Sequence, residues 1–320
     1  MKLSELRKLM HNLPKPETER DYRKLHDAVR SMGMDPNQFY QELEMESRFV
    51  DIHRDMSWSN SNVSLHSHAF YELLYCRNTC GAEYLMGSER YRLQRGDIVL
   101  VPPGISHRPL LPEKMTEPYK RYVLWISPEF IQTFSRLWFQ DSQMPHMDTG
   151  LIRTVGTHWE FLGDYFRSGV QEAERAQPGW EAAVVGNTIV LITQIKRALQ
   201  EGAVKPLQAE QPELLDQVMG YVERNLGQKI TLADTARQFY VSESTISQLF
   251  RKKMGVSFHR CVTQRRLIEA KSYIEENVPM EQVSGQVGFA DYSSFYRAFR
   301  QEYGISPRQY RKRQQDTPSE

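Results

Sequence analysis

A chain of 320 residues is long enough for two domains, each with a hydrophobic core of its own. Its 40% hydrophobic and 25% charged residues are typical of a soluble globular protein, and 41 Lys and Arg against 40 Asp and Glu say little about a polyanionic partner. Three cysteines make no disulfide framework, and neither a secretory signal nor an apolar run of roughly 20 residues is evident, so we expect a cytoplasmic protein without a membrane partner.

Short β-type segments follow a polar, helical stretch of about fifty residues. Glycine and proline separate them, most clearly at Gly96 and at Pro102-Pro103-Gly104. Several short strands with such turns between them are typical of an antiparallel barrel or sandwich. The predicted strands are residues 63–76, 82–86, 91–93, 98–101 and 122–126. We therefore expect an antiparallel β-barrel over about residues 50–130.

Helical periodicity replaces the strands from about residue 128, and helices are expected over about residues 150–200. The clearest stretch, 182–199, repeats apolar residues at three- and four-residue spacing: Val185, Ile189, Ile192 and Ile195. This face predicts a homodimer, with packing on the chain's own barrel as the alternative. Two Pro and one Gly in residues 200–212 indicate a linker, placed at 206–212 between an N-terminal domain (1–205) and a C-terminal domain (213–314).

The C-terminal domain contains a repeated unit, because residues 242–257 match residues 291–306 at an offset of 49. Each copy has a side chain that can cap a helix N-terminus, two apolar residues four apart, and a glycine suited to a helix C-terminus. These are Ser242, Ile246, Phe250 and Gly255 in the first copy, and Asp291, Phe295, Phe299 and Gly304 in the second. The pattern predicts two capped helices that each bury one face.

A shorter helix precedes each capped helix, over residues 232–238 and 281–287. A short helix, a tight turn and a capped second helix make a helix-turn-helix, and a long helix over about 258–276 joins the two units. Residues 251–271 contain a single acidic residue, Glu269, and seven basic residues: Arg251, Lys252, Lys253, Arg260, Arg265, Arg266 and Lys271. The local excess suits a nucleic acid, and equally a solvated helix face.

Residues 214–311 resemble the DNA-binding domain of the AraC family of transcription regulators. The first unit matches at Ser242, Ile246, Leu249-Phe250-Arg251-Lys252, Gly255 and Ser257, the linking helix at Arg266 and Ala270, and the second unit at Val287-Gly288-Phe289, Asp291, Phe295, Arg297, Phe299-Arg300, Gly304, Ser306-Pro307 and Tyr310-Arg311. Ser284 stands where the family prefers alanine, and a buried hydroxyl there requires a backbone acceptor.

The resemblance implies that the two capped helices enter successive major grooves of double-stranded DNA, about 34 Å apart. With the apolar residues in the core, the residues expected at DNA are Ser244, Thr245, Ser247, Gln248, Arg251, Tyr292, Ser293, Tyr296 and Arg297. Gln248 suits adenine, and Arg297 suits guanine or a phosphate. Ser306 is expected to cap a last helix whose free amides hold a phosphate.

The N-terminal domain carries His66, His68, Glu72 and His107 in a pattern that resembles the two motifs of the cupin superfamily. We place His66 and His68 on one strand face, so that both imidazoles point into the barrel. The resemblance implies a site of three histidines and one glutamate for a divalent transition metal. The sequence departs from the pattern at Leu111, where asparagine is common, and at Gly81, which falls two residues late.

Two uses of these four residues stay open. They either hydrogen-bond one another or a small-molecule effector whose pocket they border, which we favour, or hold the metal. Tyr84, Tyr91 and Trp125 are further inward candidates, and such a polar and aromatic lining suits a sugar-like effector. No cofactor is required in the first case.

The predicted fold class is therefore α+β and multidomain, with a cupin-like barrel, flanking helices and an all-α domain of two helix-turn-helix units. The predicted function is transcription regulation controlled by a small molecule, with RNA polymerase as a further partner of an activator. No enzymatic activity is expected. The alternatives are a metal-dependent cupin enzyme, a dioxygenase or isomerase, fused to a DNA-binding module, and an architectural DNA-binding protein without a ligand.

Overall fold

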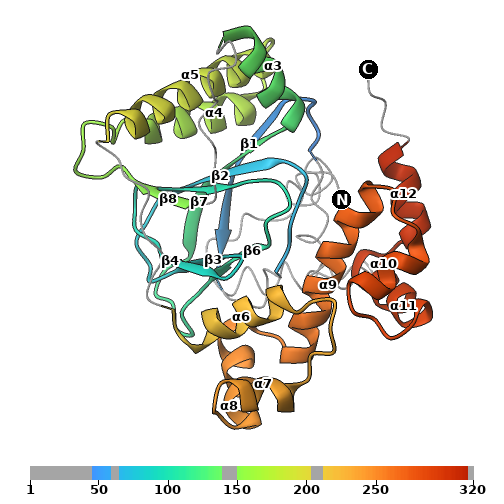
Figure 1. The fold of residues 1–320 in the computed structure, drawn as a ribbon. Helices are drawn as coiled ribbons and strands as arrows, with labels where there is room; N and C mark the ends of the chain where they lie inside the picture. The colour runs from blue at the N-terminus through green and yellow to red at the C-terminus, as the bar shows by residue number, and fades with distance from the viewer. Residues whose placement is uncertain (1–44, 59–64, 139–149, 203–211, 316–320) are drawn as a thin grey trace, which may run out of the picture.

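The computed structural model describes residues 45–58, 65–138, 150–202 and 212–315. A β-barrel occupies the middle of the molecule, helices cover one of its sides, and the C-terminal helices lie against the opposite side (Figure 1). The α+β fold class predicted above is confirmed. The polar stretch before residue 45 and residues 206–211 of the predicted linker lie outside the described residues.

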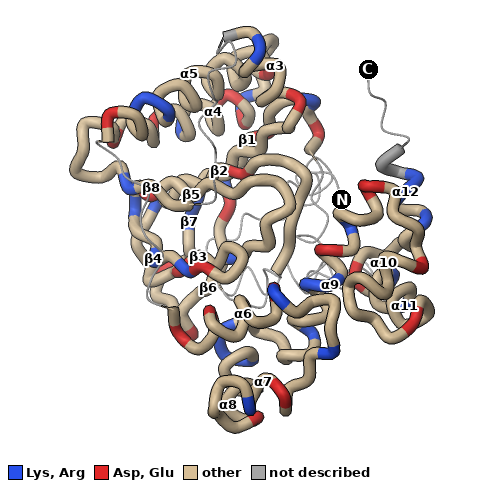
Figure 2. Tube along the Cα trace, in the orientation of Figure 1, with Lys and Arg blue, Asp and Glu red and all other residues tan. Residues whose placement is uncertain are grey.

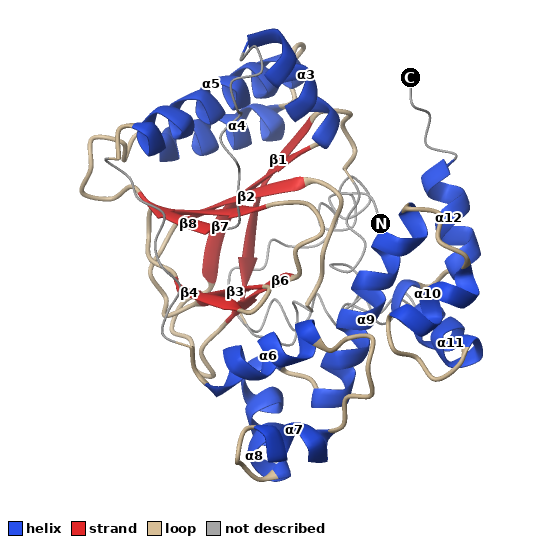
Figure 3. Ribbon diagram, viewed as in Figure 1, coloured by secondary structure: helices blue, strands red, loops and turns tan. Residues whose placement is uncertain are grey.

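Two antiparallel sheets face each other across the barrel (Figure 3). One contains β1 (Val50–Ser57), β7 (Tyr119–Ile126), β2 (Tyr71–Cys76), β5 (Asp97–Val101) and β8 (Gly150–Arg153), in that order. The other contains β4 (Glu89–Arg92), β3 (Glu83–Met86) and β6 (His107–Leu110). Apolar and aromatic side chains from both sheets, including Leu74, Tyr84 and Trp125, pack against one another between them.

The structure contains three strands that were not predicted, and one predicted strand begins later than expected. β1, β6 and β8 were not predicted; β8 lies in the range expected to be helical, so the sheet extends to residue 153. The strand predicted from residue 63 begins only at Tyr71. Residues 65–70 form an irregular segment, attached to β6 by a single bridge between His66 and His107.

Three helices cover the outer face of the larger sheet: α3 (Pro128–Trp138), α4 (Leu162–Arg175) and α5 (Trp180–Gln200). The predicted apolar face of α5 divides, because Ile192 and Ile195 are buried in this layer whereas Val185 and Ile189 lie at its margin. By length and hydropathy α5 would suit a membrane, but its buried side packs on α4 and the sheet. It therefore belongs to the helical layer that covers the larger sheet, with one side buried.

The C-terminal helices are α6 (Leu214–Arg224), α7 (Leu232–Gln238), α8 (Glu243–Leu249), α9 (Phe258–Glu275), α10 (Met280–Gln286), α11 (Tyr292–Tyr303) and α12 (Pro307–Gln315). The predicted caps are confirmed, since Ser242 accepts a hydrogen bond from the Thr245 amide and Asp291 accepts one from the Ser294 amide. A π-helical segment, Phe250–Met254, continues α8 to the left-handed Gly255. The Ser284 hydroxyl donates to the Glu281 carbonyl oxygen, which is the backbone acceptor that the sequence analysis required.

The barrel and the C-terminal helices share buried apolar surface. Leu85 and Leu110 from the outer side of the smaller sheet, and Leu65 from the irregular segment before β2, belong to one cluster with residues of α6, α8 and α9, among them Leu215, Val218 and Met219. The three barrel leucines are at most 3% exposed. The first helix-turn-helix unit is therefore seated on the β4–β3–β6 sheet.

Candidate effector site and nucleic-acid interface

Three imidazoles and one carboxylate meet inside the barrel. The ring nitrogens that His66, His68 and His107 offer lie within 4.8 Å of one another. Oε2 of Glu72 lies 3.2 Å from Nε2 of His107 and 3.8 Å from Nε2 of His68. The structure thus brings together all four residues that the sequence analysis named. We call this set the His–Glu cluster; its role stays a prediction.

Backbone carbonyls fix two of the rings. Nδ1 of His68 lies 2.8 Å from the carbonyl oxygen of Phe70, and Nδ1 of His107 lies 2.8 Å from that of Ile105. A carbonyl oxygen can only accept, so each Nδ1 carries a proton and donates it. The Nε2 of each ring therefore faces Glu72, with its lone pair directed there in the neutral ring.

Burial shapes the charges of the His–Glu cluster. Burial lowers the pKa of His68, which favours the neutral ring. Burial alone would raise the pKa of Glu72, but hydrogen bonding and charge attraction to His107 and His68, which act when these rings carry a proton on Nε2, outweigh it and hold that pKa well below its usual range. An ionised carboxylate that faces imidazole nitrogens in a dry interior requires a proton or a cation between them. The cluster is therefore suited to bind a hydrogen-bond donor or a metal ion.

Aromatic side chains complete the surroundings of Glu72. The Trp125 indole donates to Oε1 at 2.9 Å, and the Tyr84 hydroxyl donates to Oε2 at 3.4 Å. The Phe70 ring, which sequence reasoning did not single out, stacks on His68 at 3.9 Å between centroids. Tyr91 packs in the same core, but its hydroxyl donates to Glu89.

The expectation that His66 and His68 share a strand face is wrong. Both lie in the irregular segment before β2, where His66 exchanges two backbone hydrogen bonds with His107. This short bridge, together with the ring hydrogen bonds described above, brings the imidazoles together without strand periodicity. The motif predicted the residues correctly, but a backbone bridge in an irregular segment, and not a shared strand face, brings their rings together.

The donor set of the His–Glu cluster fits a divalent transition metal. Imidazole nitrogens with carbonyl-bound Nδ1 protons and one ionised carboxylate are what such ions select, and the backbone carbonyls supply the outer hydrogen bonds. The ring nitrogens lie up to 4.8 Å apart, which is too far for them to share one ion at bond lengths of 2.0–2.1 Å. The rings would therefore have to approach one another by about 1 Å or more when an ion binds. The two Nε2 atoms and Oε2 already point at one another.

The residues expected at DNA mostly lie on exposed surface of the two recognition helices, α8 and α11. Ser244, Thr245, Gln248, Arg251, Ser293 and Arg297 are exposed, and Ser247, Tyr292 and Tyr296 are half-buried. Ser306 is different, at 8% exposure. Its hydroxyl accepts from the Gln309 amide and its amide donates to the Gln309 side chain, so its own groups serve the cap of α12. A direct phosphate contact of Ser306 is therefore disfavoured.

Much of the basic run is engaged within the protein. Arg265 pairs with Glu223, and Arg260 pairs with the buried Glu302. Lys and Arg are interspersed with Asp and Glu along α9 to α12 (Figure 2). The reason is that α9 is central, and many of its residues face neighbouring helices. Its charges stabilise the domain more than they present a basic surface.

Arg266 of α9 sets how the two helix-turn-helix units sit together. Its guanidinium donates to the Leu226 carbonyl at 3.1 Å and to the Gln228 carbonyl at 2.6 Å. A Cβ on Gly288, in the turn of the second unit, would lie 2.2 Å from the same Leu226 oxygen. The loop between α6 and α7 therefore packs directly on the turn between α10 and α11, which fixes the separation of α8 and α11.

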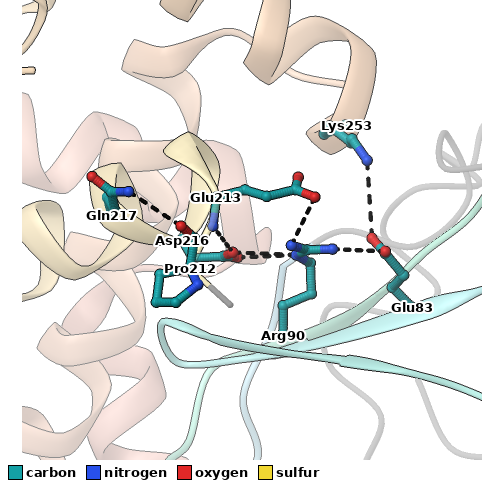
Figure 4. A network of polar contacts seen from close by, with 7 residues as sticks. All are labelled: Glu83, Arg90, Pro212, Glu213, Asp216, Gln217 and Lys253. Carbon is teal, nitrogen blue, oxygen red and sulfur yellow. Dashed lines mark hydrogen bonds and ion pairs between the residues drawn. The ribbon is translucent and has the colours of Figure 1, made fainter. Parts of the chain in front are cut away.

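A buried polar network crosses between barrel and helices, and sequence reasoning missed it (Figure 4). The Arg90 side chain, 3% exposed, contacts three carboxylates: Glu83 at 2.7 Å, Glu213 at 3.0 Å and Asp216 at 3.2 Å. Lys253 lies 3.9 Å from the other oxygen of Glu83. The sequence of β4, Glu-Arg-Tyr-Arg, is typical of a solvent-exposed strand. Its pattern therefore does not indicate the carboxylates that Arg90 contacts.

Comparison with known proteins gives matches at both regions. Residues 50–159 match the model of the AraC-like ligand binding domain, and residues 235–313 match a helix-turn-helix domain model. The chain is 25% identical over 250 residues to the HTH-type transcriptional activator RhaS of Salmonella typhimurium, covering 77% of this chain and 86% of RhaS. It is 33% identical over 138 residues to the probable transcriptional regulator LumQ of Photobacterium leiognathi, covering 43% of this chain and about half, 54%, of LumQ.

Among solved structures, unsaturated fatty acid bound ToxT from Vibrio cholerae is similar over 83% of this chain and 95% of ToxT, with 14% identity and a TM-score of 0.36. A β-barrel with an AraC-like ligand-binding match, joined to an AraC-type pair of helix-turn-helix units, defines a DNA-binding transcription regulator with a ligand-binding domain. The chain belongs to the AraC family of transcription regulators.

Proposed function

We propose that this protein is a cytoplasmic one-component regulator, which reads double-stranded DNA with α8 and α11 and responds to a small molecule held at the His–Glu cluster. The observation that carries the proposal is the pairing of two capped helices with exposed polar faces and a buried set of convergent polar groups. Each of those groups costs about 1–3 kcal/mol when left without a partner, so an occupant that bonds several of them gains affinity. An effector with several hydroxyl groups, such as a sugar, meets this chemistry.

DNA binding is tested with the full chain on a random-sequence duplex. We expect binding that weakens steeply with salt, with about 0.9 added to the log–log slope for each phosphate neutralised. Gln248→Glu places a carboxylate on the exposed face of α8 and should weaken binding about tenfold or more, because it repels phosphate. Gln171→Glu, the same change at an exposed position of α4, should leave binding unchanged. A folded protein without salt-sensitive binding would refute the proposal.

Base selection by the two recognition helices gives a second prediction. Arg297→Ala should cost roughly 1–3 kcal/mol and relax selectivity at one base pair, and Gln248→Ala should relax a different pair about one helical turn away. Selection from a randomised duplex library, repeated with each variant, reports both positions. Arg175→Ala, an exposed arginine of α4, is the matched control. Equal weakening on all sequences would make Arg297 a phosphate contact.

The carbonyl-bound Nδ1 atoms of the His–Glu cluster also favour a second candidate, in which a divalent transition metal occupies the cluster. We expect one Co²⁺ per chain with the absorption of a histidine-ligated ion, lost in His107→Gln and kept in His158→Gln, where the ring is 67% exposed. Co²⁺ retained equally by both variants would exclude the cluster. When bound, the ion would supply Lewis acidity, which is also the requirement of the alternative cupin-enzyme function.

Two further partners remain predictions. A homodimer through α4 and α5 is consistent with the partial exposure of Val190 in α5, at 40%, and of Phe161, directly before α4, at 39%. RNA polymerase is the expected partner of an activator.

A further inference from the structure

The two faces of the β4–β3–β6 sheet contact different parts of the protein. On the inner face, Tyr84 and Met86 of β3 pack in the barrel core, and His107 of β6 belongs to the His–Glu cluster. On the outer face, Leu85 and Leu110 pack against the first helix-turn-helix unit. Alternation along a strand produces this arrangement, since successive side chains point to opposite faces.

In β6 the alternation places two functional groups next to each other in sequence. His107 faces inward and lies 3.2 Å from Glu72. Arg108 faces outward, is 1% exposed, and donates through Nη1 to the carbonyl oxygen of Met254 at 2.6 Å. Met254 ends the π-helical continuation of α8. The Arg108 guanidinium therefore caps the C-terminal end of the recognition helix, where free carbonyls and the helix dipole favour a cation.

A second connection runs beside the first. His66 bridges to His107 through the backbone, and its neighbour Leu65, 3% exposed, packs in the apolar cluster shared with α6 to α9. A small pocket there is lined by Leu65, His66 and Ser67 from the barrel and by residues of α9 and α11. Two members of the His–Glu cluster are thus each one residue away from a contact with the DNA-binding helices.

We infer that Arg108 is a positioning residue that couples the His–Glu cluster to the first recognition helix, with β6 as the connecting element. The inference rests on the proposed function for its physiological meaning, because it names how an occupant of the cluster would reach α8. An occupant that draws His107 toward or away from Glu72 moves β6, and β6 carries the Arg108 guanidinium with it. The C-terminal cap of α8 then tightens or loosens.

The geometry favours this route over a diffuse one. β6 is an edge strand whose ladder partner among the described residues is β3; its other edge carries the two backbone hydrogen bonds between His107 and His66, and Pro109 within it lacks an amide proton. It can shift without breaking a ladder on both sides. The β3–β4 hairpin beside it is held to α6 by Arg90, so displacement of β6 changes the position of α8 relative to a fixed α6.

The test is a double-mutant cycle between Glu72 and Arg108 in the full chain, read by amide hydrogen exchange of residues 250–258. In the wild-type background, Glu72→Gln should change exchange there by about fivefold or more, the size of a typical coupling. In an Arg108→Met background the same substitution should change it by less than about twofold, because the connection to Met254 is gone. Arg108→Lys keeps a donor and should restore the response, which a merely structural role would not do.

Arg92→Met provides the matched control, because Arg92 is an exposed arginine of the neighbouring β4. It should leave the response to Glu72→Gln intact. An equal response in the wild-type and Arg108→Met backgrounds, or none in either, overturns the inference. Should Glu72→Gln fail to fold, Tyr84→Phe removes only the hydroxyl bonded to Glu72 and enters the same cycle with the same two outcomes.

Salt-dependent DNA binding, measured on the same samples, separates the two claims. Coupled exchange in a protein that binds no DNA refutes the proposed function and leaves the coupling standing. DNA binding with uncoupled exchange refutes the coupling alone.

Discussion

Gly288→Ala is expected to lower the free energy of unfolding by roughly 2–4 kcal/mol, because backbone strain and a backbone collision coincide at this position. Gly288 has φ +83°, a conformation that L side chains rarely adopt. An added Cβ would also lie 2.2 Å from the Leu226 carbonyl oxygen and 2.8 Å from Nη2 of Arg266. The turn of the second helix-turn-helix unit must therefore move away from the first.

The same variant should weaken specific DNA binding by more than its loss of stability accounts for. Displacement of the turn changes the separation of α8 and α11, and both must match grooves one turn apart. Chemical denaturation gives the stability, and titration of a selected two-half-site duplex, against a duplex with one half-site, gives the binding. The preference for two half-sites should fall in Gly288→Ala.

Two other glycines of the same helix-turn-helix unit separate the effect of backbone strain from the effect of the backbone collision. Gly304 also has a positive φ, +72°, but a Cβ there meets nothing within 4 Å, so Gly304→Ala reports strain alone, about 1–2 kcal/mol. Gly285 is helical with open space, and Gly285→Ala should stabilise α10 by about 0.5–1 kcal/mol. A Gly288→Ala variant no less stable than Gly304→Ala would mean that the Leu226 contact does not constrain the units.

The helix-turn-helix units were predictable because their signals are local. Ser242, Asp291, Gly255 and Gly304 each act within one turn of the helix they begin or end, so the sequence pattern and the structure agree to within a residue or two. The His–Glu cluster was predictable for a different reason. Its spacing resembles a known motif, which carries the long-range pairing of residues 66–72 with residue 107 that no local signal contains.

The missed strands lack a local signal. β6 reads His-Arg-Pro-Leu, with a proline that argues against a strand and no alternation of polar with apolar residues, because both of its faces are buried. β8 has four residues, among helices. The same burial on both faces hides the interface of barrel and helices. Arg90 and Arg108 look like solvated strand residues until the opposite surface is known.

Arg90→Met should be the most damaging change at that interface. The guanidinium lies among Glu83, Glu213 and Asp216, and the side chains of Arg90 and Asp216 are 3% and 5% exposed. Removing one partner of a buried ion pair leaves charge without compensation and typically costs about 3–5 kcal/mol. Asp216 also closes the capping box of α6 with Glu213, so its displacement loosens the helix that seats the first unit on the barrel.

The expected signature is a change in cooperativity as well as in stability. Because Arg90 and the shared apolar cluster hold the barrel and the helices together, we expect the wild-type chain to unfold in one denaturant transition. Arg90→Met should split it into two, with the C-terminal helices monitored by hydrogen exchange and the N-terminal domain by tryptophan fluorescence, because all five Trp, Trp125 among them, lie before residue 181. Arg92→Met, an exposed arginine two residues away, should change stability by less than about 0.5 kcal/mol.

A triple variant tests the reason for the loss. Adding Glu83→Gln and Asp216→Asn to Arg90→Met removes the carboxylates that were left unpaired, so stability should recover in part even though more polar contacts are gone. A simple sum of contacts predicts the reverse, a further loss with each substitution. Recovery would show that uncompensated charge, not the number of hydrogen bonds, makes Arg90 indispensable, and an unchanged or lower stability would assign the cost to the lost contacts of the guanidinium itself.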